Sequence, residues 1–319
     1  MHKDDHNLTF QVDENINNIR LDQYLAQSIH NHSRNQIQQW IKNGHVQIDD
    51  EVCMKPKTPI SANNIIQIYV PKPETIVDQP ENIPLDIVFE DSDLIVINKP
   101  PGLVVHPGAG NRSGTLLNAI LHHDPTLATL PRAGIVHRLD KDTSGLMMIA
   151  KKQPAYLQLC QALAKRQIKR QYLAIVDGRV NCAGNIDEPI GRSRYNRQKM
   201  AVTSSGKPAQ TSWTIHKRLQ HYTLIDLQLH TGRTHQIRVH MQHLGHPLLG
   251  DPTYGSHRGY KSLNSTIAKQ ISAFPRQALH AIDLQLIHPI HSTPLHIKSP
   301  VPDDMQNIIN LLDPAIPCK

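Results

Sequence analysis

The sequence predicts an α+β protein of two domains, in which a small N-terminal domain precedes a larger one built on a mixed, mainly antiparallel sheet. The chain has 319 residues, more than one ordinary domain requires. Residues 71–84 contain four prolines among charged residues, which is typical of a linker. Beyond them, candidate strands follow one another too closely for regular βαβ crossovers. The expected boundaries are a flexible N-terminus at residues 1–14, the small domain at 15–72, the linker at 73–84 and the large domain at 85–319.

Two short helices and a few strands are predicted in the small domain. Apolar residues spaced i, i+3, i+4 indicate one helix near residues 21–25 and a second between Ser33, its N-cap, and Gly44, which ends it. Alternating apolar residues then indicate strands at 45–48 and 66–70. We expect these strands to pack on the helix pair.

The large domain is predicted to combine strands with a few helices. Pro100, Pro101 and Gly102 indicate a tight reversal, Pro154 a first helical turn, and Gly245 the end of a helix. The expected strands are residues 85–89, 94–97, 103–105 and 172–176, two within 210–230, and two near 281–287 and 294–298. The expected helices begin near Thr115, span 155–165 and 234–244, and begin at Asp303.

Composition excludes several classes of protein. The N-terminus lacks the apolar region of a signal peptide, and no run of 18 apolar residues is present. The 4 cysteines form no C-x-x-C pair, which argues against a disulfide framework or a cysteine zinc site. We therefore expect a soluble, cytoplasmic protein that does not associate with a membrane.

The densest polar cluster of the chain, residues 137–145, lies between two apolar stretches. It reads H-R-L-D-K-D-T-S-G and precedes the apolar run 146–150. Strands on both sides would place Asp140 on a loop held by rigid elements, where catalytic groups are commonly mounted. A charged hairpin turn without catalytic function is the alternative interpretation.

Two nucleotide-binding interpretations fail on spacing. The protein kinase loop H-R-D has its Asp one position earlier than Asp140, and the Asn that should follow is missing. Residues 108–115 form a glycine-rich turn before a helix, but they lack the lysine of a P-loop. Ser113 also stands where a dinucleotide-binding glycine belongs.

The histidine-rich segment 230–243 does not have the pattern of a zinc site. His235 and His240 are five positions apart rather than four, and no Asp or Glu lies in the segment. A helix that presents Arg238 inward, with Arg233 and several histidines facing solvent or phosphate, fits the segment better. No metal is therefore expected.

Residues 137–145 resemble the H-R-L-D-x-x-T-S-G signature of the RluA family of pseudouridine synthases. Arg170 stands where the second motif of that family often carries Lys. The N-terminal domain is similar to an S4 RNA-binding domain, so the resemblance covers nearly the whole chain. The other segments that match the family, in order and spacing, are residues 98–107, 170–174, 229–238 and 246–255.

The resemblance implies an enzyme that isomerises uridine to pseudouridine without a cofactor. The N-glycosidic bond breaks, the uracil rotates, and the base rejoins the sugar through carbon, so neither redox chemistry nor phosphate energy is needed. Asp140 is the expected catalytic residue, a nucleophile or base near C1′ or C2′ of the sugar or C6 of the uracil. Arg238 is expected to pair with its carboxylate. Pairing of Arg238 with Asp142 is the alternative.

The resemblance also implies two residues that handle the flipped nucleotide. Tyr172 is expected to stack on the target uracil, and its hydroxyl to assist proton removal from C5. Arg138 is expected to fill the space that the flipped uridine leaves in the RNA. The alternatives are a core aromatic side chain for Tyr172 and a phosphate contact for Arg138.

The substrate implied by the resemblance is large-subunit (23S) ribosomal RNA, in the helix-69 stem-loop, bound by a monomeric enzyme either as RNA or in the assembling particle. The same chemistry on transfer RNA or on another ribosomal site is one alternative. A non-catalytic RNA-binding or ribosome-assembly factor, in which the S4-like domain carries the function, is another. Sequence separates these poorly, because RNA is recognised mainly by shape and by flipped bases.

The formal net charge of +7 is unevenly distributed along the chain. Residues 137–238 carry 18 Lys+Arg and 6 Asp+Glu, a net charge of +12, whereas residues 1–75 carry a net charge of −2. Attraction to RNA phosphates should therefore be strongest around residues 137–238. The candidate RNA contacts are Arg192, Arg194, Arg197 and Arg233 there, and Arg34, Lys42, Lys55 and Lys57 in the S4-like domain.

Overall fold

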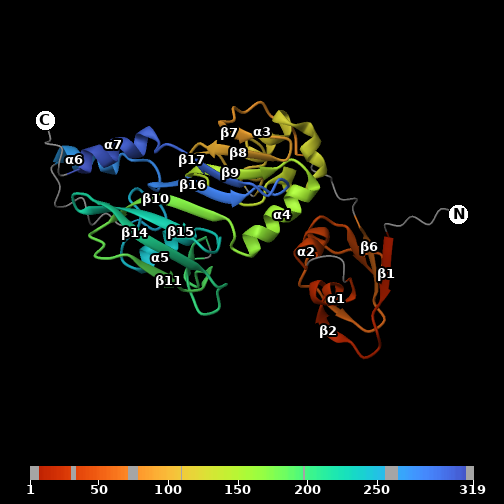
Figure 1. Cartoon of the computed structure of the whole chain (residues 1–319). Helices are drawn as coiled ribbons and strands as arrows, with labels where there is room; N and C mark the ends of the chain where they lie inside the picture. The colour runs from red at the N-terminus through yellow and green to blue at the C-terminus, as the bar shows by residue number, and fades with distance from the viewer. Residues whose placement is uncertain are drawn as a thin grey trace. The chain divides into compact units, whose positions relative to one another are not determined.

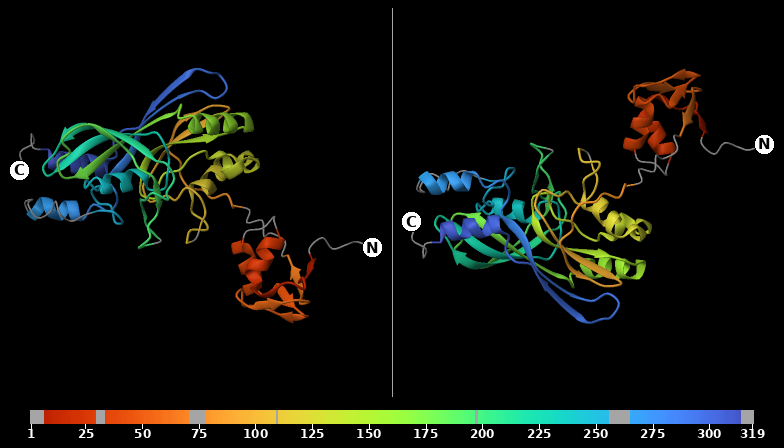
Figure 2. Two further views of the ribbon diagram at one scale, coloured as in Figure 1. Left: turned by 90° about the horizontal axis from the view of Figure 1, so that it is seen from below. Right: turned by 90° about the horizontal axis from the view of Figure 1, so that it is seen from above.

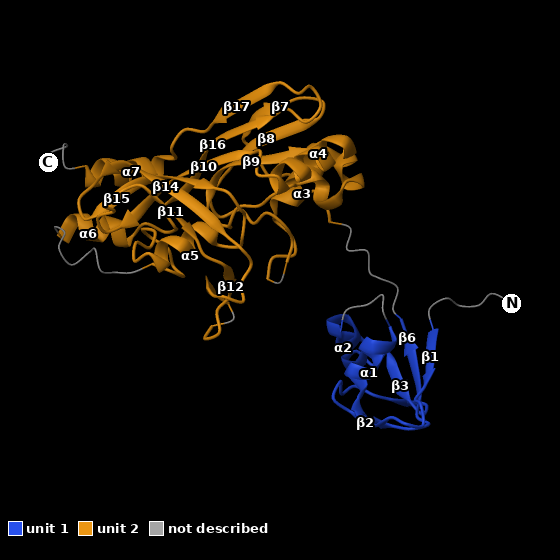
Figure 3. Ribbon diagram, turned by 60° about the horizontal axis from the view of Figure 1, so that its bottom comes forward, with its two compact units in different colours: residues 1–77 blue, residues 78–319 orange. Residues whose placement is uncertain are grey.

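The computed structural model describes residues 7–29, 34–70, 78–108, 110–196, 198–255 and 265–313. Two compact units, Met1–Val77 and Asp78–Lys319, are coloured separately in Figure 3. The division falls within the stretch expected to be a linker. The expected N-cap Ser33 and residues 71–77 of that stretch lie outside the described residues.

Unit 1 packs two helices against strands. Its main sheet has the order β1-β6-β3-β4, and β2 pairs separately with β5. Leu25 of α1 and Ile37 and Ile41 of α2 are buried against Ile66 and Ile68 of β6. The elements, labelled in Figure 1 where space allows, are β1 (Asn7–Gln11), β2 (Asn17–Arg20), α1 (Leu21–Ser28), α2 (Arg34–Lys42), β3 (Val46–Ile48), β4 (Glu51–Val52), β5 (Pro59–Ser61) and β6 (Ile65–Tyr69).

The N-terminus differs from the expectation. We expected residues 1–14 to be flexible, but Asn7–Gln11 forms β1 and pairs antiparallel with β6. The prediction is wrong for this part because Leu8, Phe10 and Val12 alternate along the chain and pack into the core of unit 1.

The second half of the expected linker is also fixed. The Asn118 side chain donates to the Gln79 carbonyl at 2.7 Å, and the Gly114 N–H donates to the Glu81 carboxylate at 2.9 Å. Residues 78–84 therefore belong structurally to unit 2.

Unit 2 is built on a 9-stranded sheet with the order β11-β14-β15-β10-β16-β9-β8-β7, and β17 pairs with β16. Among the described strands, β9 and β16 form the one parallel pair. The strands of this sheet are β7 (Ile87–Glu90), β8 (Leu94–Lys99), β9 (Ser144–Ala150), β10 (Lys169–Asp177), β11 (Gly184–Asp187), β14 (Gln210–Arg218), β15 (Tyr222–Leu229), β16 (Leu279–Ile287) and β17 (Pro294–Lys298). Two further strands, β12 (Ile190–Arg192) and β13 (Met200–Val202), pair with each other outside it. The helices are α3 (Leu116–His123), α4 (Gln153–Ala164), α5 (Gln236–His243), α6 (Ser265–Ser272) and α7 (Asp303–Leu312), with short 3-10 turns η1 (Pro125–Thr129) and η2 (Pro131–Gly134).

Helices cover both faces of this sheet, so its central strands are buried on both sides. Along β10, Tyr172 and Ala174 join the apolar core that contains α3 and α5, whereas Leu173 and Ile175 join the core that contains α6 and α7. Figure 1 and Figure 2 show α3 and α4 near β7–β9 and α6 and α7 at the other end of the sheet. Successive side chains of a strand point to opposite faces, which explains why β10 is almost continuously apolar.

The sequence-based elements agree with the structure in most places and miss some. Residues 103–105 form no strand, but a single bridge between Val104 and Thr115. The strands β11–β13 and helix α6 were not expected, because each is short and only partly apolar. No helix among the described residues has the length and apolarity needed to cross a membrane.

Gly145 is required by the parallel contact between β9 and β16. Its φ is +115°, and a Cβ at this position would lie 2.3 Å from the Ala281 carbonyl oxygen. Both the backbone conformation and the packing therefore exclude a larger residue.

We expect Gly145→Ala to lower the free energy of unfolding by about 3 kcal/mol or more, because the new methyl group forces β9 and β16 apart. The matched control is Gly102→Ala. Gly102 also has a positive φ, +85°, but nothing lies within 4 Å of the point that a Cβ would occupy there, so the loss should be about 1 kcal/mol. Thermal or denaturant unfolding of the two variants measures the difference, and equal losses would contradict the packing argument.

Candidate active site

Asp140 lies on a loop between η2 and β9 that is tied to β9 along its length. Ile135 forms a bridge with Ile149, and the Met148 N–H donates to His137 Nε2 at 3.0 Å. The loop therefore runs along a buried strand and delivers Asp140 to the strand's N-terminal end.

A buried lysine holds the other side of the loop. Lys99, at the end of β8, donates from Nζ to the carbonyl oxygens of Pro100 (2.6 Å), Leu103 (3.0 Å) and Lys141 (2.9 Å). A buried ammonium group requires such acceptors. Because Lys141 follows Asp140 directly, these bonds fix the backbone beside the carboxylate.

Arg238 of α5 joins two carboxylates. Its Nη1 donates to Asp140 Oδ2 at 2.9 Å, while Nε and Nη2 donate to the two oxygens of Asp251 at 2.7 and 2.9 Å. Arg238 is 5% exposed, and its guanidinium lies 5.1 Å from the centre of the Tyr254 ring. Burial disfavours the charged form, but Asp251 and Asp140 outweigh it and raise the pKa of Arg238. The pairing expected with Asp140 is the one that the structure contains.

His235 lies near the other carboxylate oxygen of Asp140. Its Nε2 is 4.0 Å from Asp140 Oδ1, and its Nδ1 is 2.9 Å from the Tyr254 hydroxyl. That hydroxyl also accepts the Met200 N–H at 2.8 Å. The two oxygens of Asp140 thus have different neighbours, an arginine and a histidine, which other groups orient.

A small pocket of about 50 Å³ opens beside these groups. Tyr172 lines it and is also part of the apolar core, while Arg138 lies exposed at its edge. Arg233 lines it too, with its Nε donating to the Pro208 carbonyl at 3.0 Å. The structure therefore brings Arg138, Asp140, Tyr172, Arg233 and Arg238 together, although they come from separate segments of the chain.

The Tyr172 hydroxyl is not poised to lose its proton. Burial raises its pKa above the ordinary value, Arg170 opposes this shift, and Asp140 adds to it. A neutral phenol is a weak base, so the position of Tyr172 favours stacking on a base over removal of a proton.

The other candidate RNA contacts predicted in the large domain are close together in the sequence, at β12 and the connection to β13. Arg192 and Arg194 are exposed where β12 ends and the connection to β13 begins, and Arg197 lies outside the described residues. The Tyr195 side chain, next to Arg194, is fully exposed at 101%. A protruding aromatic ring beside two arginines is suited to stacking on an unpaired base. Tyr195 was not singled out from the sequence.

In unit 1, Lys42, Lys55 and Lys57 are exposed, but Arg34 has a structural partner. Asp22 is fully buried and accepts hydrogen bonds from Arg20, Arg34 and Gln38, with Arg34 donating at 2.8 and 3.1 Å. Arg34 is therefore required to compensate a buried carboxylate, whatever contact it makes with RNA.

Several histidines of segment 230–243 were expected to face solvent or phosphate, but His240 does not. His240 is fully buried, with Nδ1 bonded to Thr211 at 2.9 Å and Nε2 to the Glu188 carbonyl at 3.0 Å. Both ring nitrogens that a metal would use are already bonded to the protein.

One cluster outside the cleft has the composition of a metal site, namely Asp91, His288 and His291. His288 Nδ1 accepts the N–H groups of Ile290 and His291 at 3.2 and 3.0 Å, so its proton lies on Nε2 and is donated to Asp91 at 2.8 Å. A metal on Nε2 would move that proton to Nδ1, against two N–H donors. The hydrogen bonds therefore favour a structural link between two turns over a metal site.

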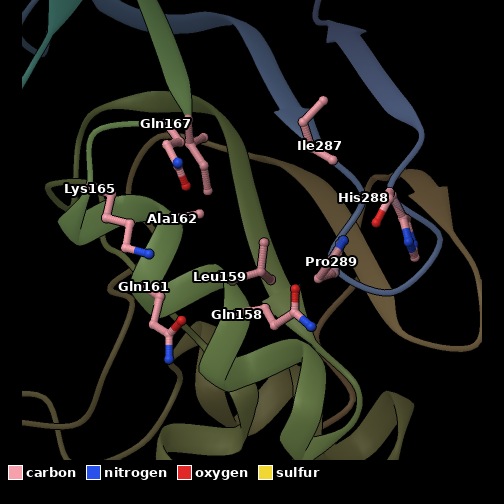
Figure 4. Close-up of a pocket in the computed structure, with 11 residues that line it drawn as sticks. Gln158, Leu159, Gln161, Ala162, Lys165, Gln167, Ile287, His288 and Pro289 are labelled. Atoms are coloured by element: carbon pink, nitrogen blue, oxygen red, sulfur yellow. The ribbon is translucent and has the colours of Figure 1, made fainter.

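A larger pocket of about 430 Å³ lies between α4 and the turn from β16 to β17, as Figure 4 shows. Gln158, Gln161, Lys165 and Gln167 line one side, and Ile287 and Pro289 the other. His288 and Ser292 complete the polar part of the lining, which contains no carboxylate. The smaller pocket beside Asp140 is the better candidate active site despite its size.

Asp251, Tyr254 and His235 were not identified as site residues from the sequence. Asp251 and Tyr254 do lie in the family-like segment 246–255, which is the signal that could have pointed to them. Asp251 and Tyr254 contact Arg238 from a different segment of the chain. The spacing of residues along the sequence therefore does not reveal these contacts.

Comparison with known proteins identifies the family. Residues 93–243 match the RNA pseudouridylate synthase family, and residues 19–66 match the S4 domain. Ribosomal large subunit pseudouridine synthase D of Escherichia coli strain K12 is 47% identical over 306 residues, which are 96% of this chain and 94% of that protein. The protein of the same name from Vibrio parahaemolyticus is 49% identical over 90% of this chain and 88% of its own length.

Solved structures agree with this comparison. Human RNA Pseudouridylate Synthase Domain Containing 4 has a TM-score of 0.55 and 25% identity, over 71% of this chain and 92% of its own. Human RNA Pseudouridylate Synthase Domain Containing 1 has a TM-score of 0.52 and 26% identity, over 72% and 86%. With an S4 domain at its N-terminus and relatives this similar over almost its full length, the chain belongs to the RluA family of RNA pseudouridine synthases.

Proposed function

We propose that this enzyme converts uridines to pseudouridine in large-subunit (23S) ribosomal RNA, in the helix-69 stem-loop, with Asp140 as the catalytic residue. The observation that carries the chemistry is the Asp140 carboxylate, held 2.9 Å from the buried Arg238 beside a pocket that Tyr172 lines. The ribosomal substrate is supported by the names of relatives that match across both domains. We expect a monomer that acts in the cytoplasm.

The two oxygens of Asp140 have different surroundings. Oδ2 accepts a hydrogen bond from Arg238, while Oδ1 faces His235 at 4.0 Å and has no hydrogen-bond donor among the described residues. Oδ1 is therefore the oxygen that approaches the nucleoside, either at C1′ or C2′ of the sugar or at C6 of the uracil. The positive charge of Arg238 pairs with the carboxylate once a base excludes water from the pocket.

The isomerisation exchanges one bond to the sugar for another. The N1–C1′ bond breaks and a C5–C1′ bond forms. The C5 proton is released to water and N1 takes up a proton from water, so the atoms balance without a co-reactant. Tyr172 stacks on the uracil and keeps it in the pocket while it rotates. Arg138, exposed at the edge, enters the space that the flipped nucleotide leaves.

Mapping of pseudouridine in ribosomal and transfer RNA from cells with and without the gene tests the substrate. Loss at helix-69 uridines is the expected result. Loss confined to transfer RNA or to another ribosomal site would overturn the substrate assignment. An unchanged map would favour a non-catalytic assembly factor.

The distribution of charge predicts which arginines and lysines hold RNA. Replacing Arg192 and Arg194 by Gln should weaken RNA binding more than replacing Lys42 and Lys55, because phosphate attraction is concentrated around the basic segment 137–238. Arg34 is left in place because its loss would leave Asp22 without one of its partners. Affinity measured across a salt titration checks the ranking, and the reverse order would show that the S4 domain is the main electrostatic contact.

A further inference from the structure

His235 has an unusual backbone conformation for its position. It immediately precedes α5 with φ +56° and ψ 24°, in the left-handed region, and it does not cap the helix with its side chain. This conformation is uncommon outside glycine and is less costly for Asn than for most residues. It places the imidazole between Asp140 and Tyr254.

Hydrogen bonds determine which ring nitrogen of His235 carries the proton. The Tyr254 hydroxyl accepts a hydrogen bond from the Met200 N–H at 2.8 Å. The hydroxyl can donate its own proton to His235 Nδ1 at 2.9 Å, which is the acceptor that the described part of the chain offers. Burial lowers the pKa of His235, so the ring is neutral near pH 7. With Nδ1 accepting, the single ring proton lies on Nε2, which faces Asp140 Oδ1.

The arrangement gives the two oxygens of Asp140 unequal partners. Arg238 binds Oδ2 directly, which by itself still allows the carboxylate to swing about that bond. A donor on the side of Oδ1 biases the carboxylate toward one orientation. At 4.0 Å it attracts the oxygen without forming a hydrogen bond, so the lone pairs of Oδ1 remain available to the nucleoside.

We propose that His235 is a positioning residue for the reaction. Its Nε2–H orients Oδ1 of Asp140 toward the nucleoside, and the hydrogen bonds of Tyr254 with His235 and with the Met200 N–H set the tautomer that this requires. This inference rests on the proposed catalytic function of Asp140. It makes the chain Met200–Tyr254–His235 a second support of the carboxylate, at Oδ1, in addition to that of Arg238 at Oδ2.

Two substitutions at His235 separate a positioning role from a structural one. The side-chain amide of Gln reaches the place of Nε2, whereas that of Asn reaches only the place of Nδ1. The backbone at this position favours Asn over Gln. A purely structural role therefore predicts that His235→Asn is the better tolerated variant, and a positioning role predicts that His235→Gln is the more active one.

The experiment measures turnover and RNA affinity of the full-length wild-type enzyme and the variants His235→Gln, His235→Asn, His235→Ala and Asp140→Asn. The substrate is total RNA from cells lacking the gene, with tritium at C5 of uridine, whose release reports the reaction on any target. We expect kcat to fall about 10- to 100-fold in His235→Asn and His235→Ala and clearly less in His235→Gln. KM and melting temperatures should change little, with His235→Asn at least as stable as His235→Gln.

The outcomes distinguish the inference from the function on which it rests. Equal activity of His235→Gln and His235→Asn, with Asp140→Asn inactive, would overturn the role of His235 and leave that of Asp140 intact. A loss that appears in KM instead of kcat would also overturn it. An active Asp140→Asn enzyme would overturn both.

Discussion

Asp140→Asn is expected to abolish pseudouridine formation while leaving the protein folded. The amide has neither the charge nor the nucleophilicity of the carboxylate, so kcat should fall by about 10⁴-fold or more. Folding should survive because Arg238 keeps its two hydrogen bonds to Asp251. Tritium release from labelled RNA measures the activity, and thermal unfolding measures the fold.

Asp142→Asn is the matched control for this variant. Asp142 lies on the same loop two residues later and was the alternative partner of Arg238, but Arg238 bonds to Asp140 and Asp251 instead. Its replacement should leave turnover within about 3-fold of the wild type. Substantial activity in Asp140→Asn, or a comparable loss in Asp142→Asn, would reject the assignment of Asp140.

The second large effect is expected from Asp251→Asn, a change that does not touch the proposed nucleoside position. Breaking a buried ion pair leaves the arginine charge only partly compensated, which should cost about 3 kcal/mol of unfolding free energy. Arg238 then lacks its anchor, and the Asp140 carboxylate shifts with it. A misplacement of this kind should lower kcat by about 10²-fold.

The acid sensitivity of the fold provides a separate check on Asp251. Burial alone would raise its pKa, but Arg238 outweighs burial and holds the pKa below the ordinary value of 3.8. Because the folded-state pKa is the lower one, the stabilisation is complete above about pH 4 and is lost as the pH falls through the folded-state value. Unfolding free energy should therefore depend less steeply on pH below about 4 in Asp251→Asn than in the wild type.

Asp283→Asn serves as the control for the loss of kcat expected in Asp251→Asn. Asp283 is another buried carboxylate, paired with His296 at 2.6 Å on β16 and β17 rather than with a residue of the pocket. Its loss should lower stability but not turnover in the folded enzyme. If both substitutions lowered kcat to the same extent, the effect of Asp251 would be one of general stability.

The sequence alone determined the two-domain α+β organisation and most elements of unit 2. Helices α3, α4, α5 and α7 and the strands β8, β10 and β16 coincide with predicted segments, because buried elements impose a period on the apolar residues that cover them. Short or edge strands such as β11–β13 bury too few apolar side chains to produce a recognisable period in the sequence. β1 was missed because its alternating residues follow a polar start that is typical of a flexible terminus.

The sequence also indicated Asp140, Tyr172 and Arg238 through contiguous motifs, since each motif holds its residue on one local element. The tertiary structure alone decided the rest. It paired Arg238 with Asp251 as well as Asp140, placed His235 and Tyr254 around the carboxylate, and gave Arg34 a buried partner in Asp22. The physical reason is that these contacts join segments that are distant in the sequence. A buried charged or polar group needs a partner, and the fold, not the spacing along the chain, determines which group that is.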